Sequence, residues 1–272
     1  MQQPIMSEHS IETDFGIAKI HDYKDINKDG DRILVVPGFS TSGNHLAELM
    51  NSMHDEGLNS FTFSQPRNNI SKPDIDPINR QAEIITSILD AELKEGEQVY
   101  AVAHSLGAAA LLKAAIANPE RFLGILLMQP IGLITDKLSL AGLMKSSIYA
   151  SLKNTFDAAN QQNNIDNVTP SQVVALYNNS IREGVKNPQL TLKEAAASTE
   201  YNITDDLNTI SGIPIDILLS NKDEFFGTAT KENIPKGTTN ISSISDKNAP
   251  HNTFWLHPNR TAKLIKHFSK NK

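Results

Sequence analysis

Ser105 is the residue whose surroundings most favour nucleophilic chemistry in this sequence. It lies in the string A-H-S-L-G at 103–107, directly after the apolar run 98–103 and directly before an alanine-rich helical pattern. A strand that passes straight into a helix needs a tight turn, and the small residues two positions before and after the serine permit one. Such a turn presents the hydroxyl beside the positive end of a helix, where a developing oxyanion is stabilised. The alternative is that Ser105 only caps the helix.

The segments on either side of this turn alternate between strand and helix patterns. Short, continuous β-branched or aliphatic runs predict strands that are buried on both faces, at 33–36, 61–63, 98–103, 123–128 and 215–219. A further strand is expected at about 241–244. Apolar residues at helical spacing predict helices at 46–53, 78–93 and 258–268. Strand followed by helix, repeated along the chain, predicts an α/β fold with a mostly parallel central sheet flanked by helices.

Residues 131–208 break this alternation, because helical patterns follow one another there without a strand pattern between them. Thr169-Pro170 is predicted to open one of these helices, and Thr191 with Glu194 is predicted to form a capping box that opens another. We therefore expect an inserted helical cap or lid at 131–208.

The cap divides the predicted core domain into residues 11–130 and 209–270. Leu143 and Met144 belong to the first apolar stripe of the cap. We expect them to contact the substrate; the alternative is that this stripe only packs against the main domain.

The string around Ser105 resembles the nucleophile elbow of the α/β-hydrolase family, usually written G-x-S-x-G, whose catalytic triad follows the chain order serine, acid, histidine. Ala103 replaces the first glycine and is also small. The resemblance covers the predicted core domain, whereas the cap matches no subfamily. It implies the α/β-hydrolase fold, a serine hydrolase activity, and no requirement for a metal or organic cofactor.

The resemblance also assigns the other members of a triad. Asp223 follows the strand 215–219 at the position of the family's acid, with the neighbouring Glu224 as the alternative. His251 lies on the loop after the last strand, where the family has its catalytic base. One ring nitrogen of a histidine there would reach Ser105 while the other contacts the acid.

Two main-chain N–H groups complete the implied site. The string V-V-P-G-F-S at 35–40 resembles the family's oxyanion loop. In that arrangement the N–H groups of Phe39 and Leu106 form the oxyanion hole. An ordinary strand-to-helix turn built on Pro37-Gly38 is the alternative.

Two further histidines compete with His251. His257 directly precedes Pro258, so we expect it at the entrance of the last helix rather than beside the serine. His104 is adjacent to Ser105, and neighbouring residues at a strand end point in opposite directions, so we expect it to pack or to make a polar contact elsewhere.

Composition narrows the class of partner. The chain has 272 residues, 25 Lys and Arg against 31 Asp and Glu, and a net charge of -6, which provides no basic surface for nucleic acid. No apolar run approaches the ~18 residues that stable membrane insertion requires. Without a signal-like N-terminus, we expect a cytoplasmic protein with a small-molecule partner; the sequence does not predict its oligomeric state.

Metal binding is not expected either. The chain has no cysteine, which excludes thiolate ligands. The string D-I-N-K-D-G at 25–30 matches the start of a calcium loop, but its twelfth position is Val36 instead of the bidentate glutamate, so we predict a polar turn.

These patterns together predict a serine hydrolase that cleaves carboxylic esters, with lactones and thioesters as possible variants, through Ser105, His251 and Asp223 and an acyl-enzyme intermediate. A carbon–carbon bond hydrolase or an acyltransferase on the same fold stays open. A non-catalytic ligand-binding protein that kept the fold is the alternative from another class.

Overall fold

The chain forms an eight-stranded sheet in the order β1-β2-β4-β3-β5-β6-β7-β8, in which β3 to β8 run parallel to one another and the β1–β2 and β2–β4 pairs are antiparallel. The computed structural model describes residues 5–24, 31–67, 75–133, 140–160, 169–223, 225–226, 229–235 and 240–270. The strands are β1 (Ile5–Thr13), β2 (Gly16–Lys24), β3 (Arg32–Val36), β4 (Asn59–Ser64), β5 (Val99–His104), β6 (Phe122–Met128), β7 (Ile215–Lys222) and β8 (Ile241–Pro250). All six predicted strands are present, and the predicted fold class is confirmed.

The sequence patterns did not predict the antiparallel hairpin β1–β2. Its outer strand has the sequence I-M-S-E-H-S-I-E-T, and those of its side chains that the structure describes are exposed or half-buried. An edge strand with one neighbour needs no continuous apolar run, so the pattern that marks the buried strands is missing here.

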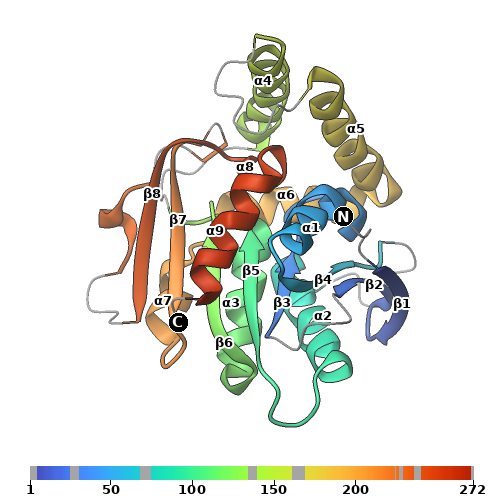
Figure 1. Cartoon of the computed structure of the whole chain (residues 1–272). Coiled ribbons are helices and arrows are strands. Elements are labelled where there is room, and N and C mark those ends of the chain that lie inside the picture. The colour runs from blue at the N-terminus through green and yellow to red at the C-terminus, as the bar shows by residue number, and fades with distance from the viewer. Residues whose placement is uncertain are drawn as a thin grey trace.

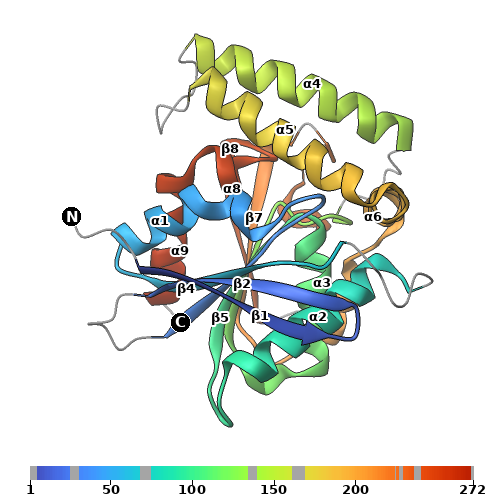
Figure 2. The same cartoon turned by 90° about the vertical axis from the view of Figure 1, so that its right-hand side faces the viewer.

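Helices cover both faces of the sheet (Figures 1 and 2). Helices α1 (Ala47–Asp55) and α9 (Pro258–Lys270) pack on one face, and α2 (Pro77–Glu92) and α3 (Leu106–Ala117) pack on the other. Alternate side chains of β5 enter the two cores, Ala101 joining the α2–α3 side and Val102 the α1–α9 side. This double burial explains why the strands are apolar at successive positions.

The segment between β6 and β7 contributes four helices and, among its described residues, no strand. They are α4 (Leu140–Ala159), α5 (Pro170–Lys186), α6 (Pro188–Glu200) and α7 (Thr204–Thr209). Helices α4 and α5 lie outside the sheet layers, beyond the end of the sheet at which β8 leads into α8 (Thr253–Leu256) (Figure 2). The arrangement fits a helical cap, and its boundaries at 131 and 208 stay a prediction.

One predicted helix start in this segment is wrong. Helix α6 begins at Pro188 with Asn187 as its N-cap, whose side chain accepts a hydrogen bond from Leu190 N at 3.0 Å. Thr191 therefore lies inside the helix, and its hydroxyl donates to main-chain oxygens of Gly184 and Asn187 at 2.8 and 3.0 Å. Pro188 at the first helical position, with Asn187 before it, determines this start in place of a capping box at Thr191.

Candidate active site

Ser105 occupies a strained turn between β5 and α3. Its φ of 53° lies in the left-handed region, which residues other than glycine adopt rarely and mostly where surrounding structure enforces it. Two hydrogen bonds fix the turn: Ser105 N donates to Met128 O at 3.1 Å, and Ala108 N donates to Ser105 O at 3.0 Å. The serine thus ends one strand, contacts the end of the next, and begins a helix whose first N–H groups have no partner within the helix.

The structure brings His251 to this serine. His251 directly follows β8, and its Nε2 lies 3.1 Å from Ser105 Oγ. On the other side of the ring, Nδ1 lies 2.7 Å from Asp223 Oδ2. The three side chains are buried, with the Asp223 side chain 7% exposed. This chain of contacts lets the imidazole accept the serine proton while the carboxylate fixes its tautomer.

The second oxygen of Asp223 fixes the orientation of the carboxylate. Oδ1 accepts hydrogen bonds from the main-chain N–H groups of Phe225 and Phe226, each at 2.9 Å. The rings of these two phenylalanines lie 4.8 and 5.2 Å from the His251 ring. The competing acid, Glu224, lies outside the described residues.

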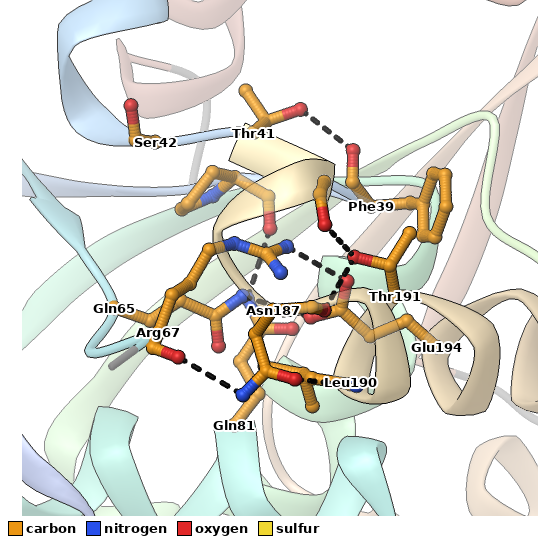
Figure 3. Close-up of polar contacts among 12 residues, drawn as sticks. Phe39, Thr41, Ser42, Gln65, Arg67, Gln81, Asn187, Leu190, Thr191 and Glu194 are labelled. Atoms are coloured by element: carbon orange, nitrogen blue, oxygen red, sulfur yellow. Dashed lines mark hydrogen bonds and ion pairs between the residues drawn. The ribbon is translucent and has the colours of Figure 1, made fainter. Parts of the chain in front are cut away.

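The loop after β3 packs closely on the Ser105 turn. A Cβ on Gly38 would lie 3.0 Å from His104 O and 3.3 Å from Ser105 Cβ, so only glycine fits this approach without displacement. Thr41 holds the next peptide, since its hydroxyl donates to Phe39 O at 2.9 Å (Figure 3). The loop carrying Phe39 N and the helix start carrying Leu106 N are therefore adjacent, as the resemblance implied for an oxyanion hole.

His104 points away from Ser105 Oγ. Its Nε2 lies 2.8 Å from His251 O, and its ring stacks on Phe254 at a centroid distance of 5.2 Å. Burial lowers the pKa of His104 well below its ordinary value, and repulsion from a positive charge on His251 acts in the same direction. His104 is thus a neutral ring whose Nε2–H donates a hydrogen bond to the main-chain oxygen of His251.

His257 lies at the entrance of α9, where its carbonyl accepts a hydrogen bond from Thr261 N at 2.9 Å. This is the position that the sequence predicts for His257. The imidazole within hydrogen-bond distance of Ser105 Oγ is that of His251.

The cap segment contacts the loop of His251 through a residue that the sequence patterns did not single out. The hydroxyl oxygen of Tyr177, on α5, accepts hydrogen bonds from Asn252 Nδ2 at 2.8 Å and from Asn154 Nδ2 at 3.0 Å. Asn252 is buried and directly follows His251. A tyrosine at one position of an amphipathic stripe gives no sign of such a contact. Leu143 and Met144 lie on α4, but their side chains are outside the described residues.

A buried ion pair is a second contact between the cap segment and the core. Glu194 of α6 contacts Arg67 Nη2 at 2.8 Å and Gln65 Nε2 at 3.2 Å, and all three residues are buried (Figure 3). The sequence pattern predicts a helix cap for Glu194, whereas its carboxylate is the partner of Arg67.

The described part of the chain holds no cluster of three or more His, Asp or Glu side chains suited to a metal ion. The calcium-like string 25–30 lies outside it. Within the same residues, none of the helices combines the length and the apolar character needed to cross a membrane.

Comparison with known proteins identifies a family and several solved structures that share the fold. None of the curated proteins compared with this chain matches it. Solved structures with the same fold include a membrane phospholipase A described as a bacterial virulence factor (16% identity, TM-score 0.72, 98% of this chain and 87% of that one). They also include an esterase from Exiguobacterium antarcticum (13% identity, TM-score 0.74, 97% of this chain and 100% of that one). A third is an N-acyl homoserine lactone degrading enzyme (15% identity, TM-score 0.70, 96% of this chain and 100% of that one).

At such identities these likenesses concern the fold alone, but the sequence comparison goes further. The family described as the alpha/beta hydrolase fold matches residues 31–258, a span that contains the Ser105 turn, the loop of Phe39 and the loop of His251. The chain belongs to the α/β-hydrolase fold family.

Proposed function

We propose that this chain is a serine hydrolase that cleaves carboxylic esters, with Ser105 as nucleophile, His251 as general base and Asp223 as the acid that orients the histidine. The observation that carries the proposal is the continuous contact from Asp223 Oδ2 to His251 Nδ1, at 2.7 Å, and from His251 Nε2 to Ser105 Oγ, at 3.1 Å. A serine hydroxyl is a weak nucleophile near neutral pH unless such a base is within reach.

In the first half of the reaction, Ser105 Oγ attacks the ester carbonyl while His251 Nε2 takes its proton. The carbonyl oxygen becomes an oxyanion, which the N–H groups of Phe39 and Leu106 stabilise. The tetrahedral intermediate collapses, the C–O bond to the alcohol breaks, and the imidazolium of His251 gives its proton to the leaving oxygen. The products of this half are the free alcohol and an acyl group on Ser105.

In the second half, a water molecule attacks the acyl carbon while His251 accepts one of its protons. Collapse of the second intermediate breaks the bond to Ser105 Oγ, which recovers its proton from His251, and the carboxylic acid leaves. Every proton in both halves is carried by His251, so the cycle closes without a cofactor.

Lactones and thioesters are substrates of the same chemistry, because each presents an acyl carbon with an oxygen or sulfur leaving group. The likeness to an esterase and to a lactone-degrading enzyme supports an acyl substrate of this kind. Transfer of the acyl group to an alcohol, or cleavage of a carbon–carbon bond, would use the same triad and differs only in the second reactant or the leaving group.

Residues 131–208 are proposed to act as the cap that selects the substrate, with Leu143 and Met144 setting the length of the acyl chain. The inserted helices α4 and α5, and the contact of Tyr177 with Asn252 beside His251, support this role. Leu143→Ala or Met144→Ala should shift the preferred chain length while leaving turnover of the best ester intact. Equal losses on every ester would mean that these side chains only pack.

The activity is tested with a chain-length series of 4-nitrophenyl esters, together with one lactone and one thioester. We expect turnover of at least one member by the wild type and none above background by Ser105→Ala. Turnover that survives in Ser105→Ala, or folded wild-type protein that hydrolyses none of the series, would contradict the proposal.

A further inference from the structure

The carbonyl oxygen of Pro37, at the start of the loop that carries Phe39, is held by the side chain of Gln81. Gln81 Nε2, on α2, donates to Pro37 O at 2.9 Å (Figure 3). Gln81 is 1% exposed, and Pro37 is buried as well. Water therefore cannot substitute for this donor without a change in the packing.

The elbow holds the same carbonyl from the other side. A Cβ on Gly107, in the first turn of α3, would lie 2.4 Å from Pro37 O, so the oxygen rests against the bare Cα of that glycine. The Pro37 carbonyl is thus confined between the amide of Gln81 and the helix that begins beside Ser105.

The Phe39 N–H belongs to the Gly38–Phe39 peptide, and Gly38 joins that peptide to the Pro37 carbonyl. Because glycine rotates freely about φ and ψ, the joint has no intrinsic preference, so the direction of the Phe39 N–H depends on an anchor on each side of Gly38. The bond from Gln81 Nε2 to Pro37 O is the anchor before it. Beyond it, Gly38 O accepts a hydrogen bond from Thr41 N at 3.3 Å. In a trans peptide the N–H points opposite to the C=O, so the Phe39 N–H points away from Thr41.

We propose that Gln81 is a positioning residue for the oxyanion hole: it anchors the loop before Gly38, as Thr41 N anchors it after Gly38, and the two bonds together keep the N–H of Phe39 in the orientation that receives the oxyanion on the Ser105 adduct. The inference rests on the proposed function. It adds to the reaction a residue that touches neither the triad nor the substrate.

The incomplete hydrogen bonding of Gln81 favours a functional role over simple packing. Its Oε1 is buried and has no hydrogen-bond partner among the residues that the structure describes. Burying half of an amide without a partner costs free energy, and a methionine of similar volume would avoid that cost. The donor to Pro37 O is what a methionine could not supply.

The test compares wild type with Gln81→Met, which keeps the volume and removes the donor, and with Gln81→Leu, which removes both polar atoms of the amide. On 4-nitrophenyl acetate we expect kcat to fall by about tenfold to a hundredfold, part of the roughly 10²–10³ that loss of a whole oxyanion donor costs. KM should change little, because the oxyanion exists only beyond the ground state.

Affinity for a phenylboronic acid should fall by a similar factor, because the boronate formed on Ser105 places an oxygen in the oxyanion hole. Ile88→Val, a change in the buried face of the same helix, is the matched control and should keep both kcat and boronate affinity.

Unchanged kcat and boronate affinity in both Gln81 variants would overturn the inference. An equal loss in Ile88→Val would also overturn it, since the effect would then be one of helix packing. A wild type that neither binds boronate nor hydrolyses esters would refute the proposed function itself, and the inference with it.

Discussion

Replacing Asp223 by asparagine should nearly abolish turnover while leaving the fold intact. Asp223 Oδ1 accepts from two main-chain N–H groups, those of Phe225 and Phe226, at 2.9 Å each. In Asp223→Asn these donors keep the amide oxygen at the Oδ1 position, because the reverse orientation would set the amide NH₂ against both. The NH₂ group then faces His251 Nδ1, at the place where Oδ2 lies 2.7 Å away in the wild type.

A donor at that place forces His251 Nδ1 to accept, so the ring proton moves to Nε2 and the ring can no longer take the proton of Ser105. The wrong tautomer costs about 10⁴ in kcat in a triad of this kind, which corresponds to roughly 5.5 kcal/mol. We expect this loss on 4-nitrophenyl acetate, with the melting temperature little changed.

Glu224→Gln is the matched control, because it makes the same chemical change at the next residue and should leave kcat within a few-fold of wild type. A fall of less than tenfold in Asp223→Asn would refute the reasoning. So would a crippling Glu224→Gln beside a mild Asp223→Asn, which would identify Glu224 as the acid.

Three further perturbations follow from the contacts around the site. Tyr177→Phe removes the acceptor of the Asn252 amide beside His251, and we expect a several-fold lower kcat/KM in ester hydrolysis; a kcat/KM equal to that of the wild type would show that the contact is unimportant. Glu194→Gln leaves the buried Arg67 without its counter-ion, and urea unfolding should show that the free energy of unfolding falls by about 3–5 kcal/mol. An unchanged free energy of unfolding would show that this ion pair does not stabilise the fold. Burial lowers the pKa of His104 in the folded state, so the contribution of its neutral ring to stability is complete above about pH 6.5 and is lost as the pH falls towards the folded pKa, by up to about 1.4 kcal/mol per pH unit. In urea unfolding, the free energy of unfolding of His104→Phe should therefore fall less steeply with decreasing pH than that of the wild type. The same pH dependence in both proteins would contradict this prediction.

The sequence predicted the parts of the fold that are determined locally. Strands β3, β5 and β6 are buried on both faces and almost entirely apolar, so they stood out, whereas β8 is indicated only by the partly buried Ile241 and Ile244. The hairpin β1–β2 did not stand out, because β1 is an exposed edge strand and polar residues interrupt the apolar positions of β2. The start of α6 was wrong because Pro188 and Asn187 were overlooked in favour of a capping box at Thr191.

In the candidate site, too, the sequence predicted the features that arise from residues adjacent in the chain and missed the contacts between distant residues. The turn at Ser105 is recognisable because a strand, small residues and a helix are adjacent in the chain, and the family's order of residues then points to Asp223 and His251. The supporting contacts carry no such sign: Gln81 and Pro37 are 44 residues apart, Tyr177 and Asn252 are 75 apart. Only the folded chain brings these pairs together.

The central claim, that His251 activates Ser105, is tested most directly by labelling with a fluorophosphonate and locating the adduct by mass spectrometry. Phosphonylation at neutral pH requires a base within hydrogen-bond distance of the serine and donors for the phosphonyl oxygen. We predict one adduct, on Ser105, in the wild type, and its loss in folded His251→Ala. Folded wild-type protein that takes no label, or takes it on another serine, or a His251→Ala variant that labels as fast as wild type, would contradict the claim.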